Sequence, residues 1–209
     1  MPNIFTRRVL NRFKKQVPEL AEAIDNADLK LEPSFTPPFQ MLVKSITYQQ
    51  LSGKAATTIL DRFLALLEQF TPRAVLSKSV EELRSVGLSR QKASYIHNVA
   101  EAFDRGGSLA KYNKMEALAN LSSEEITRLF VSIKGVGVWT AQMYLIFSLG
   151  RLDVLASGDL GVRKGVMRMY CLDKMPTANQ VEEIAAKWHP LETVGTCLAW
   201  RTLALEKAK

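Results

Sequence analysis

Two glycines spaced two residues apart form the clearest candidate for a ligand-binding stretch of backbone. They lie in Ile133-Lys134-Gly135-Val136-Gly137, between two segments with helical patterning. Glycine permits a tight turn and leaves N–H groups uncovered by a Cβ. These amides precede the next helix, where unsatisfied donors and the helix macrodipole favour an anion. The spacing predicts a phosphate-binding hairpin, and a plain turn with a glycine C-cap is the alternative.

A second chemical candidate is the carboxylate of Asp159, 22 residues after Gly137. It stands directly before Leu160-Gly161-Val162-Arg163, the start of a predicted helix, and it follows the loop-forming pair Ser157-Gly158. Taken alone, an aspartate in this place is predicted to be the N-cap of that helix, because its side chain can accept a bond from a first-turn amide.

Charge weakly favours a polyanionic partner. The chain of 209 residues carries 28 Lys and Arg against 21 Asp and Glu, a formal net charge of +7, and the excess is spread along the sequence. Basic residues gathered on one face would release counterions from a nucleic acid. A solvated basic surface explains the charge equally well. The 23% charged content and eight prolines spread along the chain are typical of a globular protein and exclude a disordered or fibrous one.

Cysteine and histidine usage predicts no metal site. Cys171 and Cys197 are too few for an iron-sulfur cluster, and His97 and His189 lack zinc-ligand spacing with each other or with either cysteine. The first residues lack the apolar region of a signal peptide. The longest uncharged stretch, residues 135–150, is short for a bilayer span and is predicted to be a buried core helix. No membrane partner is expected.

The elements that position these candidates are predicted to be helices. Apolar residues recur at intervals of three and four, as in Ile59, Leu60, Phe63 and Leu64, and an all-α protein of about ten helices follows. Loop residues interrupt this pattern at 33–38, 106–108 and 156–158. Three predicted helices begin with a capping box, and the pairs are Ser79 with Glu82, Ser122 with Glu125, and Thr177 with Gln180.

Further segments give these candidates a family resemblance. The hairpin is followed by Val138-Trp139-Thr140-Ala141, and it is preceded by residues 45–56 (SITYQQLSGKAA) and 87–93 (GLSRQKA); Trp188 and Trp200 lie downstream. Together with Asp159, this ordered set resembles the helix-hairpin-helix (HhH-GPD) DNA glycosylases, in their alkylbase (3-methyladenine II) branch. The resemblance runs from about Pro38 to Leu203.

The resemblance implies an all-α fold of two helical lobes with a cleft between them. Residues 1–209 would form a single glycosylase unit. Residues 36–155 would be the central helical barrel lobe, which includes hairpin 133–138, and residues 1–35 with 156–209 would be the second lobe. Damaged bases would be flipped into the cleft.

The implied function is that of a monofunctional glycosylase of base excision repair, which hydrolyses the N-glycosidic bond of alkylated purines such as 3-methyladenine or 7-methylguanine. Asp159 matches the family's catalytic acid. Bifunctional relatives carry a Schiff-base lysine two residues after the second hairpin glycine, where this chain has Trp139, so no lyase activity is expected.

Two alternatives accompany this function. Ser157-Gly158 replaces the second acid or proline-acid pairing that is usual in the family. This departure suggests a catalytically weak or inactive homologue that binds abasic or distorted DNA. The other alternative is a scaffold module that binds undamaged duplex without lesion preference.

The resemblance also implies roles around the flipped base. Tyr48, Trp139 and Trp200 would wall a pocket for a cationic base by cation–π stacking, with core packing as the alternative for Trp139 and Trp188. Gln50 and Leu51 would plug the gap in the base stack, with a buried Leu51 in an ordinary turn as the alternative. The phosphate-binding residues would be Ser52, Lys54, Gly87, Ser89, Lys134, Gly135, Val136, Gly137, Arg163 and Lys164, with Arg90 and Lys92 beside the second hairpin.

The expected partner is double-stranded DNA with alkylated bases or abasic sites, bound by a monomer. Hydrolysis needs no cofactor, although a hairpin of this type can hold a structural monovalent cation on its backbone carbonyls. DNA repair places such a protein in the nucleus of a eukaryote and otherwise in the cytoplasm.

Overall fold

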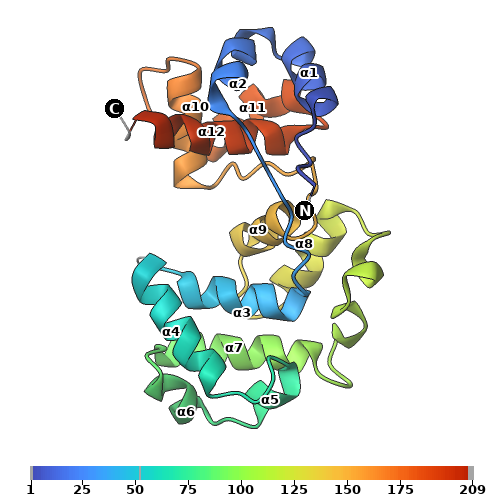
Figure 1. Ribbon diagram of the computed structural model, residues 1–209, viewed down its shortest axis with the longest axis vertical. Coiled ribbons are helices and arrows are strands. Elements are labelled where there is room, and N and C mark those ends of the chain that lie inside the picture. Colours follow the sequence, from blue (N-terminus) through green and yellow to red (C-terminus); the bar gives the residue numbers. More distant parts are fainter. Residues whose placement is uncertain (1, 52, 207–209) are drawn as a thin grey trace. The chain divides into compact units, whose positions relative to one another are not determined.

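The computed structural model describes residues 2–51 and 53–206, and every regular element among them is a helix (Figure 1). The all-α prediction is therefore confirmed. The chain divides into two compact units, with boundaries after Ser34 and after Tyr144. The middle segment, residues 35–144, forms the contiguous unit. The segments before and after it together form the discontinuous unit.

The second boundary lies at 144 rather than at 155, where the sequence analysis put it. Residues 145–155 belong to the discontinuous unit because their backbone groups form hydrogen bonds with other residues of that unit. The Ser34 N–H donates to the Phe147 carbonyl at 2.8 Å, and the Val154 N–H donates to the Thr193 hydroxyl at 3.1 Å.

The contiguous unit is built around two neighbouring helices, α3 and α7, which pack against each other (Figure 1). Aromatic edge contacts fill its core, with Phe39 and Phe63 against Phe70 and with Phe130 against Tyr144. Its elements are α3 (Pro38–Tyr48), α4 (Gly53–Ala65), α5 (Pro72–Leu76), α6 (Val80–Ser85), α7 (Arg90–Phe103), the 3₁₀ turns η2 (Ala110–Tyr112) and η3 (Met115–Leu118), α8 (Ser123–Val131) and most of α9 (Val138–Phe147).

The discontinuous unit is built on the packing of α10 against α12. These helices approach closely because Gly165 has no side chain, and a Cβ there would lie 2.2 Å from the Ala199 carbonyl oxygen. Trp188 is fully buried against Phe13, which confirms the alternative that this tryptophan packs in the core. The elements are α1 (Arg7–Gln16), η1 (Pro18–Leu20), α2 (Ala21–Ala27), α10 (Leu160–Met169), α11 (Ala178–Ala185), η4 (Ala186–Trp188) and α12 (Glu192–Glu206).

All three predicted capping boxes are present, at the starts of α6, α8 and α11. In the first, the Ser79 N–H donates to Glu82 at 2.7 Å and the Glu82 N–H donates to the Ser79 hydroxyl at 3.1 Å. Hydrogen bonds from the backbone and hydroxyl of the cap serine lower the pKa of Glu82, and equivalent bonds from Ser122 lower that of Glu125.

Of the long uncharged stretch, residues 138–147 form α9, in which Ala141 and residues 143–146 are buried. Within residues 2–51 and 53–206, no helix has both the length and the apolar character needed to cross a membrane.

The two cysteines differ in environment, which gives a first prediction. Cys171 is exposed, whereas burial in α12 raises the pKa of the Cys197 thiol to about 12. Only thiolates react readily, so a thiol reagent near neutral pH will label Cys171 alone in the folded protein and both residues after denaturation. Cys171→Ser should abolish labelling of the folded protein. Rapid labelling of both would contradict the assignment.

The raised Cys197 pKa also predicts an alkaline loss of stability. The folded state keeps this thiol neutral, whereas the unfolded state releases its proton near the ordinary value of 9.0. Above that value the unfolded state binds fewer protons, so the free energy of unfolding falls as pH rises from 9 toward 12. Denaturant titrations across this range should show a weaker pH dependence in Cys197→Ala.

Candidate active site and nucleic-acid interface

Asp159 is the N-cap of α10, as predicted from its position alone. Its Oδ1 accepts the Val162 N–H at 2.8 Å and also the Trp200 indole Nε1–H at 2.8 Å. One donor comes from its own helix and the other from α12. These two bonds fix the carboxylate at the start of α10.

Two further residues shape the surroundings of this carboxylate. The Trp200 ring stacks on Phe147, with centroids 5.9 Å apart and planes 18° apart. A Cβ at Gly161 would come 2.9 Å from Asp159 Oδ1 and 3.0 Å from Trp200 Cδ1. Glycine is therefore needed at 161 for the Asp159–Trp200 pair to form. Neither Phe147 nor Gly161 is predicted as a site residue from the sequence, and only the position of Gly161, two residues after the candidate acid, indicates a role.

The loop before Asp159 is held in place despite its departure from the family pattern. Ser157 is only 9% exposed and donates its hydroxyl to Glu182 Oε1 in α11 at 2.7 Å. The Asp159 N–H donates to the Ala156 carbonyl at 3.0 Å. A Cβ at Gly158 would meet no atom within 4 Å. The Ser157-Gly158 pair therefore does not leave the loop unanchored.

The hydrogen bond from Trp200 to Asp159 can be tested separately from the stacking of the Trp200 ring on Phe147. Trp200→Phe keeps an aromatic ring for the Phe147 stack and removes the indole donor from Asp159. If Asp159 is the catalytic acid that the family resemblance implies, base release in a single turnover should slow by roughly tenfold, since a hydrogen bond to a charged group contributes about 1.5–3 kcal/mol. Affinity for an abasic-site analogue should change less than twofold. Equal losses of affinity and rate would instead indicate general disruption of the unit.

The glycine hairpin, residues 133–138, connects α8 to α9 in the contiguous unit. The Val136 N–H donates to the Ile133 carbonyl at 3.0 Å, so this amide closes the turn and is not the donor the phosphate prediction assumed. The Val136 side chain is buried. The first backbone bond of α9 runs from the Ala141 N–H to the Gly137 carbonyl. Gly137 therefore stands at the exposed start of the helix.

The two hairpin glycines are there for different reasons. Gly135 has φ +103°, and a Cβ on it would lie 2.2 Å from the Tyr95 ring, so the fold itself requires glycine. Gly137 has no left-handed φ, and a Cβ on it would meet nothing within 4 Å. No packing constraint explains glycine at 137. The open space above this backbone suits close approach of a ligand.

The second hairpin repeats this local design at the α6–α7 junction. Gly87 has φ +108°, and its N–H donates to the Arg84 carbonyl at 2.9 Å. The Ser89 hydroxyl caps α7 by accepting the Lys92 N–H at 3.2 Å. Arg90 is exposed and pairs with Glu81 at 3.1 Å.

Two basic residues that the sequence analysis assigned to a DNA face are used within the protein. The Lys92 ammonium donates to the Thr47 and Gln49 carbonyls at 2.8 and 2.6 Å. The Arg163 Nε–H donates to the Pro176 carbonyl at 2.7 Å. Lys54, Lys134 and Lys164 are exposed, as a phosphate contact requires. Ser52 lies outside the described residues.

The predicted plug and two of the predicted pocket aromatics are exposed. Tyr48, Leu51 and Trp139 are 40%, 40% and 44% exposed, so the alternatives that buried Leu51 and Trp139 in the core are wrong. The Tyr48 hydroxyl bonds with the Thr57 hydroxyl at 2.8 Å. Gln50 has φ 57°, an unusual value for a residue with a side chain. Residues 48–51 are called the plug turn below.

One face of α7 supports both the plug turn and the glycine hairpin. The Lys92 ammonium donates to the Gln49 carbonyl, directly before Gln50. The Tyr95 ring packs on Gly135. The Asn98 side-chain amide donates to the Lys134 carbonyl at 3.0 Å. These three residues are spaced three apart, so they share a face of the helix. Of these three residues, only Lys92 is a candidate from the sequence, and there as a DNA contact.

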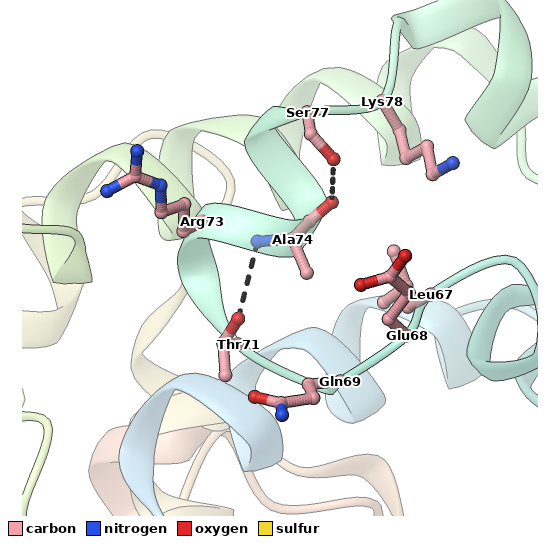
Figure 2. A pocket seen from close by; sticks show the side chains of 8 residues that line it. All are labelled: Leu67, Glu68, Gln69, Thr71, Arg73, Ala74, Ser77 and Lys78. Carbon is pink, nitrogen blue, oxygen red and sulfur yellow. Dashed lines mark hydrogen bonds between the residues drawn. The ribbon is translucent and has the colours of Figure 1, made fainter.

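A separate cavity of about 410 Å³ lies beside α5, and it contains none of the predicted site residues (Figure 2). Two of its polar groups are used locally, because the Thr71 hydroxyl accepts the Ala74 N–H and the Ser77 hydroxyl donates to the Ala74 carbonyl. The lining residues are Leu67, Glu68, Gln69, Thr71, Arg73, Ala74, Ser77 and Lys78. This cavity therefore does not serve as the predicted base pocket.

Residues 43–191 match the model of the HhH-GPD superfamily base excision DNA repair proteins, and the chain belongs to this superfamily. Its relatives place it in the alkylbase glycosylase branch. It is 34% identical over 171 residues to DNA-3-methyladenine glycosylase 1 of Schizosaccharomyces pombe, covering 80% of this chain and 73% of that protein. It is 31% identical over 176 residues to the alkylbase DNA glycosidase-like protein mag2 of the same yeast, covering 81% and 80%.

Solved structures agree with this placement. The DNA-3-methyladenine glycosidase of Bacillus halodurans is similar with a TM-score of 0.85 at 30% identity, over 100% of this chain and 95% of that one. The S. pombe 3-methyladenine DNA glycosylase Mag1, solved in complex with abasic DNA, is similar with a TM-score of 0.77 at 28% identity, over 93% and 95%.

Proposed function

We propose that this protein is a monofunctional DNA glycosylase that hydrolyses the N-glycosidic bond of alkylated purines such as 3-methyladenine or 7-methylguanine. The observation that carries the proposal is the Asp159 carboxylate, held by the Val162 amide and the Trp200 indole at the start of α10. Relatives named as 3-methyladenine glycosylases support the substrate class.

The proposed reaction needs little chemistry from the protein. Alkylation at N3 or N7 gives the purine a positive charge, so the base departs readily once the glycosidic bond begins to break. The remaining task is to stabilise the oxocarbenium-like sugar and to direct a water molecule to it. A fixed carboxylate does this by electrostatic attraction in a site that needs no reorganisation during the reaction.

Strand cleavage is not part of the proposal. A lyase step requires an amine that attacks C1′ of the sugar and forms a Schiff base. The position expected for that amine holds Trp139, whose indole has no nucleophilic nitrogen. The product is therefore an intact strand with an abasic site.

DNA recognition is assigned to the contiguous unit. The exposed rings of Tyr48 and Trp139 suit stacking against a base, and Gln50 and Leu51 would fill the gap left in the duplex. The amides at the start of α9 would bind phosphate beside Gly137. We further propose that the protein acts as a monomer without a catalytic cofactor, in the compartment that holds the genome. We also propose that the backbone carbonyls of the glycine hairpin can bind a structural monovalent cation.

The alternative is a homologue that binds abasic or distorted DNA without excising bases. This alternative rests on the Ser157-Gly158 pair, which replaces the second acid or proline-acid pairing that is usual in the family. The hydrogen bond from Ser157 to Glu182 disfavours this alternative, because it anchors the loop before Asp159 to α11.

A single experiment separates these functions. Duplex DNA carrying one 7-methylguanine is incubated with excess protein, and free base is measured over time beside binding to an abasic analogue and to the unmodified duplex. Strand breaks are scored with and without alkali. The proposal expects base release and breaks only after alkali. Abasic preference without release would establish the alternative, and equal binding to all duplexes would establish a scaffold module.

A further inference from the structure

The plug turn has the geometry of a type II β-turn. Gln49 has φ −54° and ψ 133°, Gln50 has φ 57°, and the Leu51 N–H donates to the Tyr48 carbonyl at 3.4 Å. Glycine or asparagine is normal at the left-handed position of this turn. A glutamine there costs about 1–2 kcal/mol. Some other contact must favour this conformation over the common type I turn.

That contact is the Lys92 ammonium. Type I and type II turns differ by a flip of their central peptide, which here joins Gln49 to Gln50. Lys92 donates to the Gln49 carbonyl at 2.6 Å, and that carbonyl belongs to the central peptide. In the flipped orientation the carbonyl would point away and the bond would be lost. The bond therefore favours the orientation that places Gln50 in the left-handed region.

The position of Lys92 strengthens this bond. Its ammonium also donates to the Thr47 carbonyl at 2.8 Å, near the C-terminus of α3. The macrodipole makes this end of a helix negative. Partial burial lowers the pKa of Lys92, because the charged form loses contact with water. Bonds to two carbonyls compensate for this desolvation, and charge-assisted bonds are stronger than neutral ones.

We propose that Lys92 is a positioning residue that locks the plug turn in its type II conformation and so holds Gln50 and Leu51 ready to replace a flipped base. The inference rests on the proposed function, since it assigns the support of the plug. Lys92 itself contacts no DNA in this account. Because Tyr95 and Asn98 on the same face of α7 contact the glycine hairpin, one helix supports both elements.

The test compares Lys92→Met, which keeps an unbranched side chain as far as Cε and removes the ammonium, with the matched control Lys114→Met. Lys114 is exposed on the same unit, away from the plug turn in sequence. We expect Lys92→Met to reduce the preference for an abasic analogue over intact duplex by about tenfold. Affinity for intact duplex should change equally little in both variants. Chemical shifts and scalar couplings of Gln50 should show its φ becoming negative.

A second substitution separates positioning from simple stabilisation of α3. Asparagine tolerates the left-handed region, so in the Gln50→Asn background the effect of Lys92→Met on the φ of residue 50 should largely disappear. If Lys92 only stabilised the end of α3, the effect would be equal in both backgrounds, and the proposal would be overturned. Should Lys92→Met fail to fold, Lys92→Gln is measured in the same way.

The turn conformation distinguishes failure of this inference from failure of the proposed function. A wild-type protein that releases no base overturns the proposed function, and one without abasic preference overturns the plug role. A Gln50 that stays left-handed in Lys92→Met overturns the inference alone, even where wild type releases bases normally.

Discussion

Asp159→Asn should leave the protein folded and nearly abolish base release. Asparagine is as good an N-cap as aspartate, and its amide oxygen can accept the same Val162 and Trp200 bonds that Oδ1 accepts now. The substitution therefore removes negative charge with little change of geometry. Loss of one preorganised electrostatic group lowers a rate by on the order of 10²- to 10³-fold. Single-turnover release from methylated duplex measures this.

The control for Asp159→Asn is Asp173→Asn, the same change at an exposed aspartate of the same unit. It should release base at the wild-type rate. Thermal unfolding of Asp159→Asn should differ from wild type by about 1 kcal/mol or less, the contribution of a charge at a helix N-terminus. Wild-type release by Asp159→Asn would show that the carboxylate is only a cap.

Gly135→Ala should have the largest effect on stability. Alanine at φ +103° is strained, and its Cβ would lie 2.2 Å from the Tyr95 ring. Backbone strain and overpacking together predict a loss of about 2–4 kcal/mol in the free energy of unfolding. Denaturant titration measures this loss. Affinity for duplex DNA should fall as well, because the hairpin must shift.

The matched control is Gly137→Ala, in the same hairpin. A Cβ there meets no atom within 4 Å, so the free energy of unfolding should change by less than about 0.5 kcal/mol. Binding to duplex DNA should weaken, since a methyl group would stand where phosphate approaches. Wild-type affinity in Gly137→Ala would argue that phosphate does not approach this amide.

Local rules were enough to predict the all-α class and several helix starts. A capping box lies within four residues, so Ser79 with Glu82 is visible in the sequence. The same holds for the cap at Asp159. The second bond of Asp159 could not be predicted, because Trp200 Nε1 reaches it from a helix 41 residues away. Phe147 and Glu182 lie closer to Asp159 in the sequence, but they too are on other helices, and only the tertiary packing brings them to Trp200 and Ser157.

Lys92 shows the limit of assigning charged residues from sequence. Its type and its place after a hairpin suggested a DNA contact. Whether a lysine near a helix start points outward depends on what packs beside it, and here the end of α3 presents two carbonyls. Arg163 differs from expectation for the same reason, because a backbone carbonyl lies within its reach.

The divided chain of the discontinuous unit sets an order of assembly during synthesis. Residues 35–144 can fold as soon as they have left the ribosome, since their unit is contiguous. α1 and α2 precede this unit in the sequence, but their partners follow it: Phe13 packs on Trp188, and the Arg201 Nε–H donates to the Ala27 carbonyl. The half that holds Asp159 is therefore completed only after residues up to Arg201 have been synthesised, when the hairpin and plug turn can already have formed.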